Sequence, residues 1–249
     1  MVASKNFARQ GRLIFGLEFK KVKKFSQADI HFLHIGKCAG TQISHIANQI
    51  NNISSQTKII KHGHDVYLKD LEPESRYFFS IRNPISRFKS GFYSRKRKGQ
   101  PRIYNEWSDH DREAFKDFEH ANDLAESLFA AGEVGLKAFA AMKSIRHTAQ
   151  NQSDWFYKCG HFLEIQPPIW IIRQENFVDD LNSFLKRSLL GISIEQINVS
   201  EDHIVTHASD YSNFPALSDK AKENLSHWYA QDYEFYRLCE HWLRERENQ

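Results

Sequence analysis

Two short segments of the chain combine small residues with basic side chains in patterns that suit phosphate binding. Residues 34–42 read His-Ile-Gly-Lys-Cys-Ala-Gly-Thr-Gln, and residues 82–90 read Arg-Asn-Pro-Ile-Ser-Arg-Phe-Lys-Ser. Small residues let backbone N–H groups approach an anion, and the first turn of a following helix adds a favourable dipole. Either segment alone is more often an ordinary helix start with a solvated basic face, so the interpretation depends on finding both.

The charged side chains of these segments suit two separate phosphate groups. Lys37 supplies a point charge within reach of an anion on the first segment. Arg82 and Ser90 offer an arginine fork and a hydroxyl for a second phosphate. We assign Arg87 to a structural ion pair rather than to a ligand. The first segment is not a Walker A motif, which places its lysine after the second glycine, so a nucleoside triphosphatase is disfavoured.

Hydrophobic periodicity predicts the elements that hold these segments in place. An apolar run over 30–35 predicts a buried strand, and apolar residues at helical spacing after Gly40 predict a helix. Residues 77–81 predict a second strand, which ends at Arg82, and Pro84 suits the first turn of the next helix. Alternating strands and helices favour a parallel sheet covered on both faces, with ligands at the carboxyl ends of its strands.

Three further elements are expected towards the C-terminus. Residues 169–172 predict a third strand. An apolar stripe predicts a helix after it, and this stripe consists of Val178, Leu181, Phe184 and Leu185. Apolar residues at spacings of three and four then predict one long amphipathic helix, which begins near Ser218.

The composition of the 249 residues is that of an ordinary globular chain, with 41% hydrophobic, 26% charged and 13% aromatic residues. It excludes collagen-like, mucin-like and intrinsically disordered classes. The formal net charge of +3 is too small to argue for a nucleic-acid partner. No apolar run is long enough for a transmembrane segment, and the N-terminus lacks a secretory signal pattern. Three cysteines without C-x-x-C spacing favour a reduced, cytoplasmic setting.

Together the two segments resemble the signature of sulfotransferases that use 3′-phosphoadenosine 5′-phosphosulfate (PAPS), most closely the heparan and chondroitin branch. That signature is strand-H-I-P-K-T-G-G-T-helix followed by strand-R-D-P-x-x-R-x-x-S-helix. Looser similarities follow over residues 147–150, 175–177 and 229–236. The resemblance implies a P-loop-like, three-layer α/β fold with a central parallel sheet flanked by helices. It also implies a single sulfotransferase domain over 29–249, after a basic segment over 1–28.

The resemblance further implies a role for each matching residue. In that family the first segment holds the 5′-phosphate of the cofactor, and the second holds the 3′-phosphate. Cofactor binding is thereby implied for Lys37, Cys38, Ala39, Gly40, Thr41, Gln42, Arg82 and Ser90. Lys37 is also implied as a catalytic residue, which contacts the bridging oxygen as charge builds on it. The implied cofactor is PAPS, its product is 3′,5′-diphosphoadenosine, and no metal is expected.

The chain departs from the family pattern at four positions. These are Gly36 (usually Pro), Cys38 (usually Thr), Ala39 (usually Gly) and Asn83 (usually Asp). If position 39 needs a left-handed backbone, alanine costs about 1–2 kcal/mol there. The change to Cys38 removes one hydroxyl contact to phosphate, which backbone N–H groups can replace.

The catalytic base is expected in residues 61–65, which read Lys-His-Gly-His-Asp and lie between the two segments. Related carbohydrate 6-O-sulfotransferases place a catalytic histidine in this region. A histidine with a pKa near 6.5 suits general-base catalysis at neutral pH. Both His62 and His64 are candidates, and His64 is favoured because it is nearer the expected position. In an extended chain the two would point the same way, but no third ligand for a metal appears nearby.

The expected acceptor is a hydroxyl of a carbohydrate or glycoconjugate. The basic run over 94–102 is predicted to be a solvated loop, and its alternative is a patch that attracts an anionic glycan. It lacks the interleaved aromatic residues of a single-stranded nucleic-acid site. Two other functions are kept as alternatives: a nucleotide kinase of related fold, and a non-catalytic module that binds anions or glycans.

Overall fold

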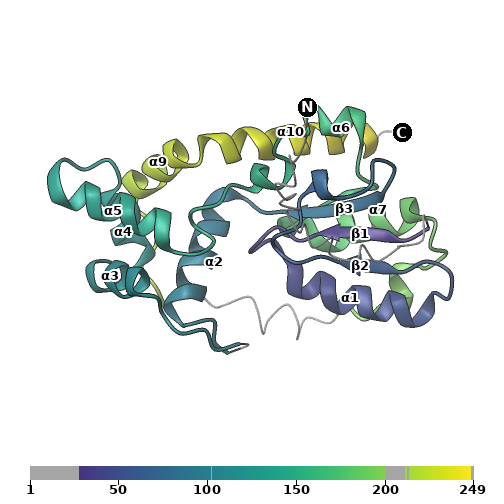
Figure 1. Cartoon of the computed structure of the whole chain (residues 1–249), viewed down its shortest axis with the longest axis horizontal. Coiled ribbons are helices and arrows are strands. Elements are labelled where there is room, and N and C mark those ends of the chain that lie inside the picture. Colours follow the sequence, from purple (N-terminus) through teal and green to yellow (C-terminus); the bar gives the residue numbers. More distant parts are fainter. Residues whose placement is uncertain (1–27, 102, 200–210, 212, 248–249) are drawn as a thin grey trace, which may run out of the picture.

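The computed structural model describes residues 28–101, 103–199, 211 and 213–247. Within them, four parallel strands form one sheet in the order β2-β1-β3-β4 (Figure 1). The strands are β1 (Ile30–Leu33), β2 (Ile59–Lys61), β3 (Arg76–Ile81) and β4 (Ile171–Arg173). Apart from residue 28, the predicted basic N-terminal segment lies outside the described residues.

The two central strands are apolar because both of their faces are covered. Every residue of β1 is buried, and so is every residue of β3 after Arg76. Ile30 of β1 lies opposite Ile59 of β2 on one side and opposite Arg76 of β3 on the other. Such continuous apolar runs are typical of parallel strands buried on both faces.

Helices cover both faces of this sheet, as the sequence predicts. On β3, Phe78 contacts Phe184 of α7 (Phe177–Ser188), with ring centroids 4.2 Å apart. The next residue, Phe79, contacts Phe235 of α10 (Ala230–Glu247) at 6.3 Å. Because neighbouring side chains of a strand point to opposite faces, α7 and α10 lie on opposite sides. Figure 1 shows α10 above the sheet and α1 (Gly40–Ile53) below it.

A second group of helices packs around its own hydrophobic cluster, separate from the cluster of the sheet. It comprises α2 (Pro84–Lys96), α3 (Asp109–Asp117), α4 (Ala121–Ser127), α5 (Gly132–Ser144) and α9 (Asp219–Trp228). Figure 1 shows α3, α4 and α5 gathered at one end of the molecule, with α2 leading to them from β3. The short α6 (Phe162–Ile165) and a 3₁₀ turn over Gln152–Phe156 return the chain to the sheet.

The structure differs from the predicted elements in three places. Strand β2 was not predicted, because three residues are too few for a periodic signal. The predicted C-terminal helix is two helices, α9 and α10, divided at Tyr229. Val178 is 50% exposed rather than part of the buried stripe, and Phe177 is buried instead. In the described part of the chain, no helix is both long and apolar enough to cross a bilayer.

Candidate functional site

The two phosphate-binding segments predicted from the sequence meet at one edge of the sheet. The loop over residues 34–39 joins β1 to α1, and Arg82 directly follows β3. Strands β1 and β3 are parallel neighbours, so their carboxyl ends lie side by side. The guanidinium of Arg82 donates to the carbonyl oxygen of Lys37 at 3.5 Å. The structure therefore brings the first segment and Arg82 together, as expected.

The start of α1 has neither a side-chain cap nor an acidic residue in its first turn. Lys37 and Ala39 both have left-handed backbones, with φ of 68° and 57°. Ala39 is the N-cap residue and provides no side-chain cap, and the first turn of α1 contains no acidic residue. Among the described residues, the buried Nε2 of Gln42 has no hydrogen-bond partner. An anion bound here would supply an acceptor for Gln42 and would match the helix dipole.

The left-handed backbone of Ala39 leads to a stability prediction. Replacing Ala39 with glycine should raise the free energy of unfolding by about 0.5–1 kcal/mol, because glycine adopts a positive φ without steric cost. Urea denaturation of the two proteins measures the difference. Ala140→Gly is the matched control, since it puts glycine into the exposed middle of α5 and should cost about 1 kcal/mol. A loss of stability in Ala39→Gly would contradict the strain at this position.

Gly36 in the loop and Gly40 at the start of α1 are both required by imidazole rings packed against them. A Cβ atom at Gly40 would lie 1.7 Å from Nε2 of His34, and one at Gly36 would lie 2.8 Å from Nδ1 of His147. A contact of 1.7 Å is far inside van der Waals distance, so no other residue fits at position 40 while His34 keeps its place. The ring at His147 likewise explains glycine at position 36, where the family has proline.

His64 lies at the centre of a histidine cluster beside this loop. Its ring centroid is 4.0 Å from that of His34 and 5.7 Å from that of His147. Its Nδ1 is 2.9 Å from the carbonyl oxygen of His34. A carbonyl oxygen only accepts, so Nδ1 carries the proton and Nε2 of the neutral ring is the basic atom. Burial lowers the pKa of His64, while the bond to His34 opposes that shift. His64 is therefore neutral at neutral pH, and its Nε2 is the nitrogen that can accept a proton.

His62 occupies a different environment. Its Nε2 is 2.8 Å from Nδ1 of His31, and the two rings stack with centroids 5.1 Å apart. His34 instead stacks on Phe32, the residue after His31 on β1. His62 and His64 therefore contact different histidines of this part of the chain. β2 ends at Lys61 and the chain turns at His64 and Asp65, so this segment is not the extended chain in which the two rings would point the same way.

The thiol of Cys38 faces the protein interior. Cys38 is fully buried, and its Sγ donates to Oε1 of Gln152 at 3.3 Å. Burial raises the pKa of this thiol to about 12, so it is not a nucleophile at neutral pH. Any contact of this residue with a phosphate must come from its backbone.

Ser90 lies in α2, one turn after Arg87, and is 7% exposed. In the described part of the chain, no hydrogen bond joins its hydroxyl to Arg82. The N-terminus of α2 is capped by Asn83, whose side chain accepts from the backbone N–H groups of Ile85 and Ser86. Unlike the start of α1, this helix start therefore has its own cap.

Arg87 forms a structural ion pair, as the sequence predicts. It is 1% exposed and lies 3.6 Å from the carboxylate of Asp232. Its Nε donates to the carbonyl oxygen of Gly36 at 3.0 Å, and its Nη1 donates to that of Gln150 at 2.6 Å. Burial raises the pKa of Asp232, and Arg87 opposes the shift. From its buried position, Arg87 thus holds the backbone of the first loop at Gly36.

Sequence reasoning missed two residues that contribute to the site. His147 packs against the first loop, and burial, followed by the charge of Lys37, lowers its pKa to about 2. Its Nδ1 is buried and has no hydrogen-bond partner among the described residues. Gln152 contacts both loops through its side-chain amide. Only the looser similarity over 147–150 pointed towards this part of the chain.

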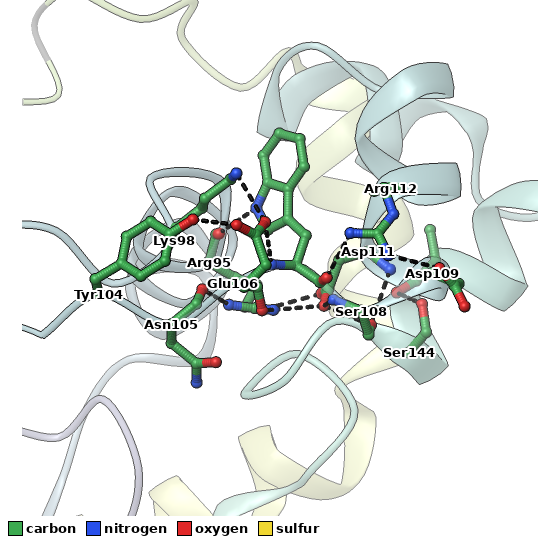
Figure 2. Close-up of polar contacts among 12 residues, drawn as sticks. Arg95, Lys98, Tyr104, Asn105, Glu106, Ser108, Asp109, Asp111, Arg112 and Ser144 are labelled. Carbon is green, nitrogen blue, oxygen red and sulfur yellow. Dashed lines mark hydrogen bonds and ion pairs between the residues drawn. The ribbon is translucent and has the colours of Figure 1, made fainter.

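The basic run over 94–102 begins inside α2 and continues as a turn, and three of its basic side chains form ion pairs. Figure 2 shows the contacts of Arg95 with Asp111 and of Lys98 with Glu106. The N–O distances of these two ion pairs are 2.6 Å and 2.7 Å. Lys96 pairs with Glu119 at 2.7 Å. Acidic residues that follow in the chain neutralise these charges. The anionic-glycan patch suggested for this run is therefore not supported.

Comparison of the chain with protein-family models, curated proteins and solved structures finds no significant match. Within the described residues, no group of three or more His, Cys, Asp or Glu side chains is arranged to hold a metal ion. The site is therefore interpreted from its own geometry.

Proposed function

We propose that this protein transfers the sulfuryl group of PAPS to a hydroxyl of a carbohydrate or glycoconjugate, on a P-loop-like fold. The observation that supports this best is the uncapped start of α1 beside Arg82, at the carboxyl ends of neighbouring strands. This arrangement provides two groups of donors for a nucleotide that carries phosphate at both its 5′ and 3′ positions. It agrees with the residue pattern that resembles PAPS-dependent sulfotransferases.

The chemistry of the donor set fits such an anion. Gln42 Nε2 and Arg87 Nη2 are buried and, within the described residues, have no hydrogen-bond partner. An amide nitrogen and a guanidinium nitrogen can only donate, so both require acceptors. Leaving buried donors unsatisfied costs about 1–3 kcal/mol each. Phosphate oxygens bound at the loop would offset this cost directly or through ordered water.

The residues of the site divide into binding and catalytic roles. When bound, PAPS supplies a sulfuryl group, whose bond to the 5′-phosphate oxygen breaks as the acceptor oxygen bonds to sulfur. The backbone over 39–42 holds the 5′-phosphate, and Arg82 and Ser90 hold the 3′-phosphate. Lys37 stabilises the negative charge that develops on the departing phosphate oxygen.

His64 acts as the general base in this proposal. Its Nε2 takes the proton of the acceptor hydroxyl, and the bond from Nδ1 to the carbonyl of His34 keeps the ring in the required tautomer. The ring then carries the positive charge until the proton passes to solvent. His62 lacks this arrangement, because its Nε2 faces His31.

The first test is thermal stabilisation by nucleotides. A ligand that binds only the folded protein raises the melting temperature, so 3′,5′-diphosphoadenosine should raise it more than AMP or ADP at equal concentration. ATP with Mg²⁺ should have no comparable effect. A shift with ATP and Mg²⁺ alone would favour the kinase, and no shift with any nucleotide would favour the non-catalytic module.

The role of Arg82 is tested by its ligand specificity. Arg82→Ala should weaken binding of 3′,5′-diphosphoadenosine by about 1.5–3 kcal/mol, the scale of a lost charged hydrogen bond. Binding of AMP, which lacks the 3′-phosphate, should hardly change. Isothermal titration calorimetry measures both affinities. An equal loss for the two nucleotides would remove Arg82 from the 3′-phosphate site.

A further inference from the structure

The side-chain amide of Gln152 forms the two hydrogen bonds to the backbone of Arg82 that a neighbouring strand would form. Its side chain is fully buried. The amide Oε1 accepts from the backbone N–H of Arg82 at 2.9 Å, and the amide Nε2 donates to the backbone carbonyl of the same residue at 2.9 Å. This pair of bonds continues the hydrogen bonding of β3 by one residue, at the point where the side chain of Arg82 leaves the sheet.

The same amide also contacts the first loop. Oε1 of Gln152 accepts from the thiol of Cys38, which lies between the two left-handed residues Lys37 and Ala39. The Oε1 atom of Gln152 therefore accepts hydrogen bonds from both loops of the site. The amide orientation is determined by these partners, because Oε1 meets two donors while Nε2 meets the carbonyl of Arg82 and the carboxylate of Asp232.

A second route connects the loops through buried charges. Asp232 of α10 is fully buried, accepts from the backbone N–H of Gln152 and pairs with Arg87 of α2. Arg87 donates to the carbonyl oxygen of Gly36 in the first loop. Gln152, Asp232 and Arg87 thus form a chain of contacts that begins at Arg82 and ends at Gly36. All three side chains are buried, so they link the two loops through the protein interior.

We propose that Gln152 is a positioning residue that sets the spacing between the two loops, and thereby the preference for a nucleotide with both 3′ and 5′ phosphates. This inference rests on the proposed function. A nucleotide with two phosphates must contact both loops at once, so its affinity increases when the spacing between the loops is already correct before binding. A 5′-monophosphate contacts only the first loop, so its affinity does not depend on the spacing between the loops.

The test compares Gln152→Met with a matched control. Methionine keeps the length of the side chain but forms none of its hydrogen bonds. Asn224→Leu is the control, because the amide of Asn224 donates to the carbonyls of Ala125 and Leu128 in the other helix group, away from both loops. Calorimetry then gives the ratio of the dissociation constants of AMP and 3′,5′-diphosphoadenosine. We expect this ratio to fall about tenfold in Gln152→Met and to stay unchanged in Asn224→Leu.

Amide hydrogen exchange without nucleotide tests the same link independently. In Gln152→Met, exchange should become faster both at Arg82 and over residues 36–42, whereas Asn224→Leu should leave both unchanged. Cys38→Ala removes the thiol that donates to Gln152 and to the carbonyl of Gly36. It should speed exchange over 36–42 alone, so it serves if Gln152→Met fails to fold.

The outcomes separate this inference from the proposed function. An unchanged nucleotide ratio, or unchanged exchange over 36–42 in both variants, would overturn the role of Gln152. If the wild-type protein does not prefer the bisphosphate, the proposed function fails. The exchange measurement then still decides whether Gln152 couples the loops.

Discussion

Replacing His64 with asparagine is expected to lower kcat for sulfuryl transfer by about 10²–10⁴-fold, the range that a general base contributes. Asparagine places an amide nitrogen near the position of Nδ1 and so keeps a donor for the carbonyl of His34. It has no atom equivalent to the basic Nε2. The affinity for 3′,5′-diphosphoadenosine, measured by calorimetry, should therefore stay near that of the wild type.

The pH dependence of kcat provides a second test of His64. The base acts when neutral, and burial lowers its pKa below the ordinary value of 6.5. A group with a lowered pKa stays neutral above that pKa and becomes protonated only as the pH falls through it. The acidic limb of the kcat profile should therefore lie below pH 6.5 and should be absent in His64→Asn.

His62→Asn is the matched control for this prediction. His62 contacts His31 rather than His34, so its replacement should leave kcat and the acidic limb close to those of the wild type. If His62→Asn abolishes transfer while His64→Asn does not, the base has been assigned to the wrong histidine.

Replacing Lys37 with methionine is expected to lower kcat by about 10²–10³-fold, as measured for single groups that stabilise charge in a transition state. Methionine keeps most of the aliphatic stem and, like lysine, lacks branching at Cβ, so it should tolerate the left-handed backbone equally well. The charge at this position is the main difference between the two proteins. Steady-state kinetics with a carbohydrate acceptor measures the effect.

The control for Lys37 is Lys61→Met. Lys61 is an exposed lysine at the end of β2, in the neighbouring strand but outside the first loop. Its replacement should leave kcat unchanged. A Lys37→Met protein that loses affinity for 3′,5′-diphosphoadenosine but keeps its kcat would show that Lys37 binds the ground state only.

Much of the site's framework was predictable because its signals are local. The apolar run over 30–35 and the helical spacing after Gly40 correspond to β1 and α1. Asn83 and Pro84 form a cap and a first turn within one short segment, so the start of α2 was also predictable. Strand β2 was not, because three residues gain their stability from pairing with β1 rather than from their own pattern.

The roles of the polar residues depended on contacts between distant parts of the chain. The same composition of basic residues fits a free patch or a set of ion pairs, and only the positions of Asp111, Glu106 and Glu119 showed the latter. Likewise, His62 and His64 have the same intrinsic pKa but different surroundings. The ring of His64 contacts a backbone carbonyl, whereas the ring of His62 contacts the ring of His31.

The sequence by itself determined the α/β class, the order of the two loops and the residue types available at the carboxyl edge of the sheet. Only the tertiary structure decided that Gln152 bridges the loops, that Asp232 pairs with Arg87, and that His64 rather than His62 hydrogen-bonds to the backbone of the first loop. Periodicity and capping act over a few neighbouring residues and can be seen in a linear chain. Burial and hydrogen-bond partners depend on packing between residues more than 100 positions apart, such as Cys38 and Gln152, and these set the chemistry of each polar group.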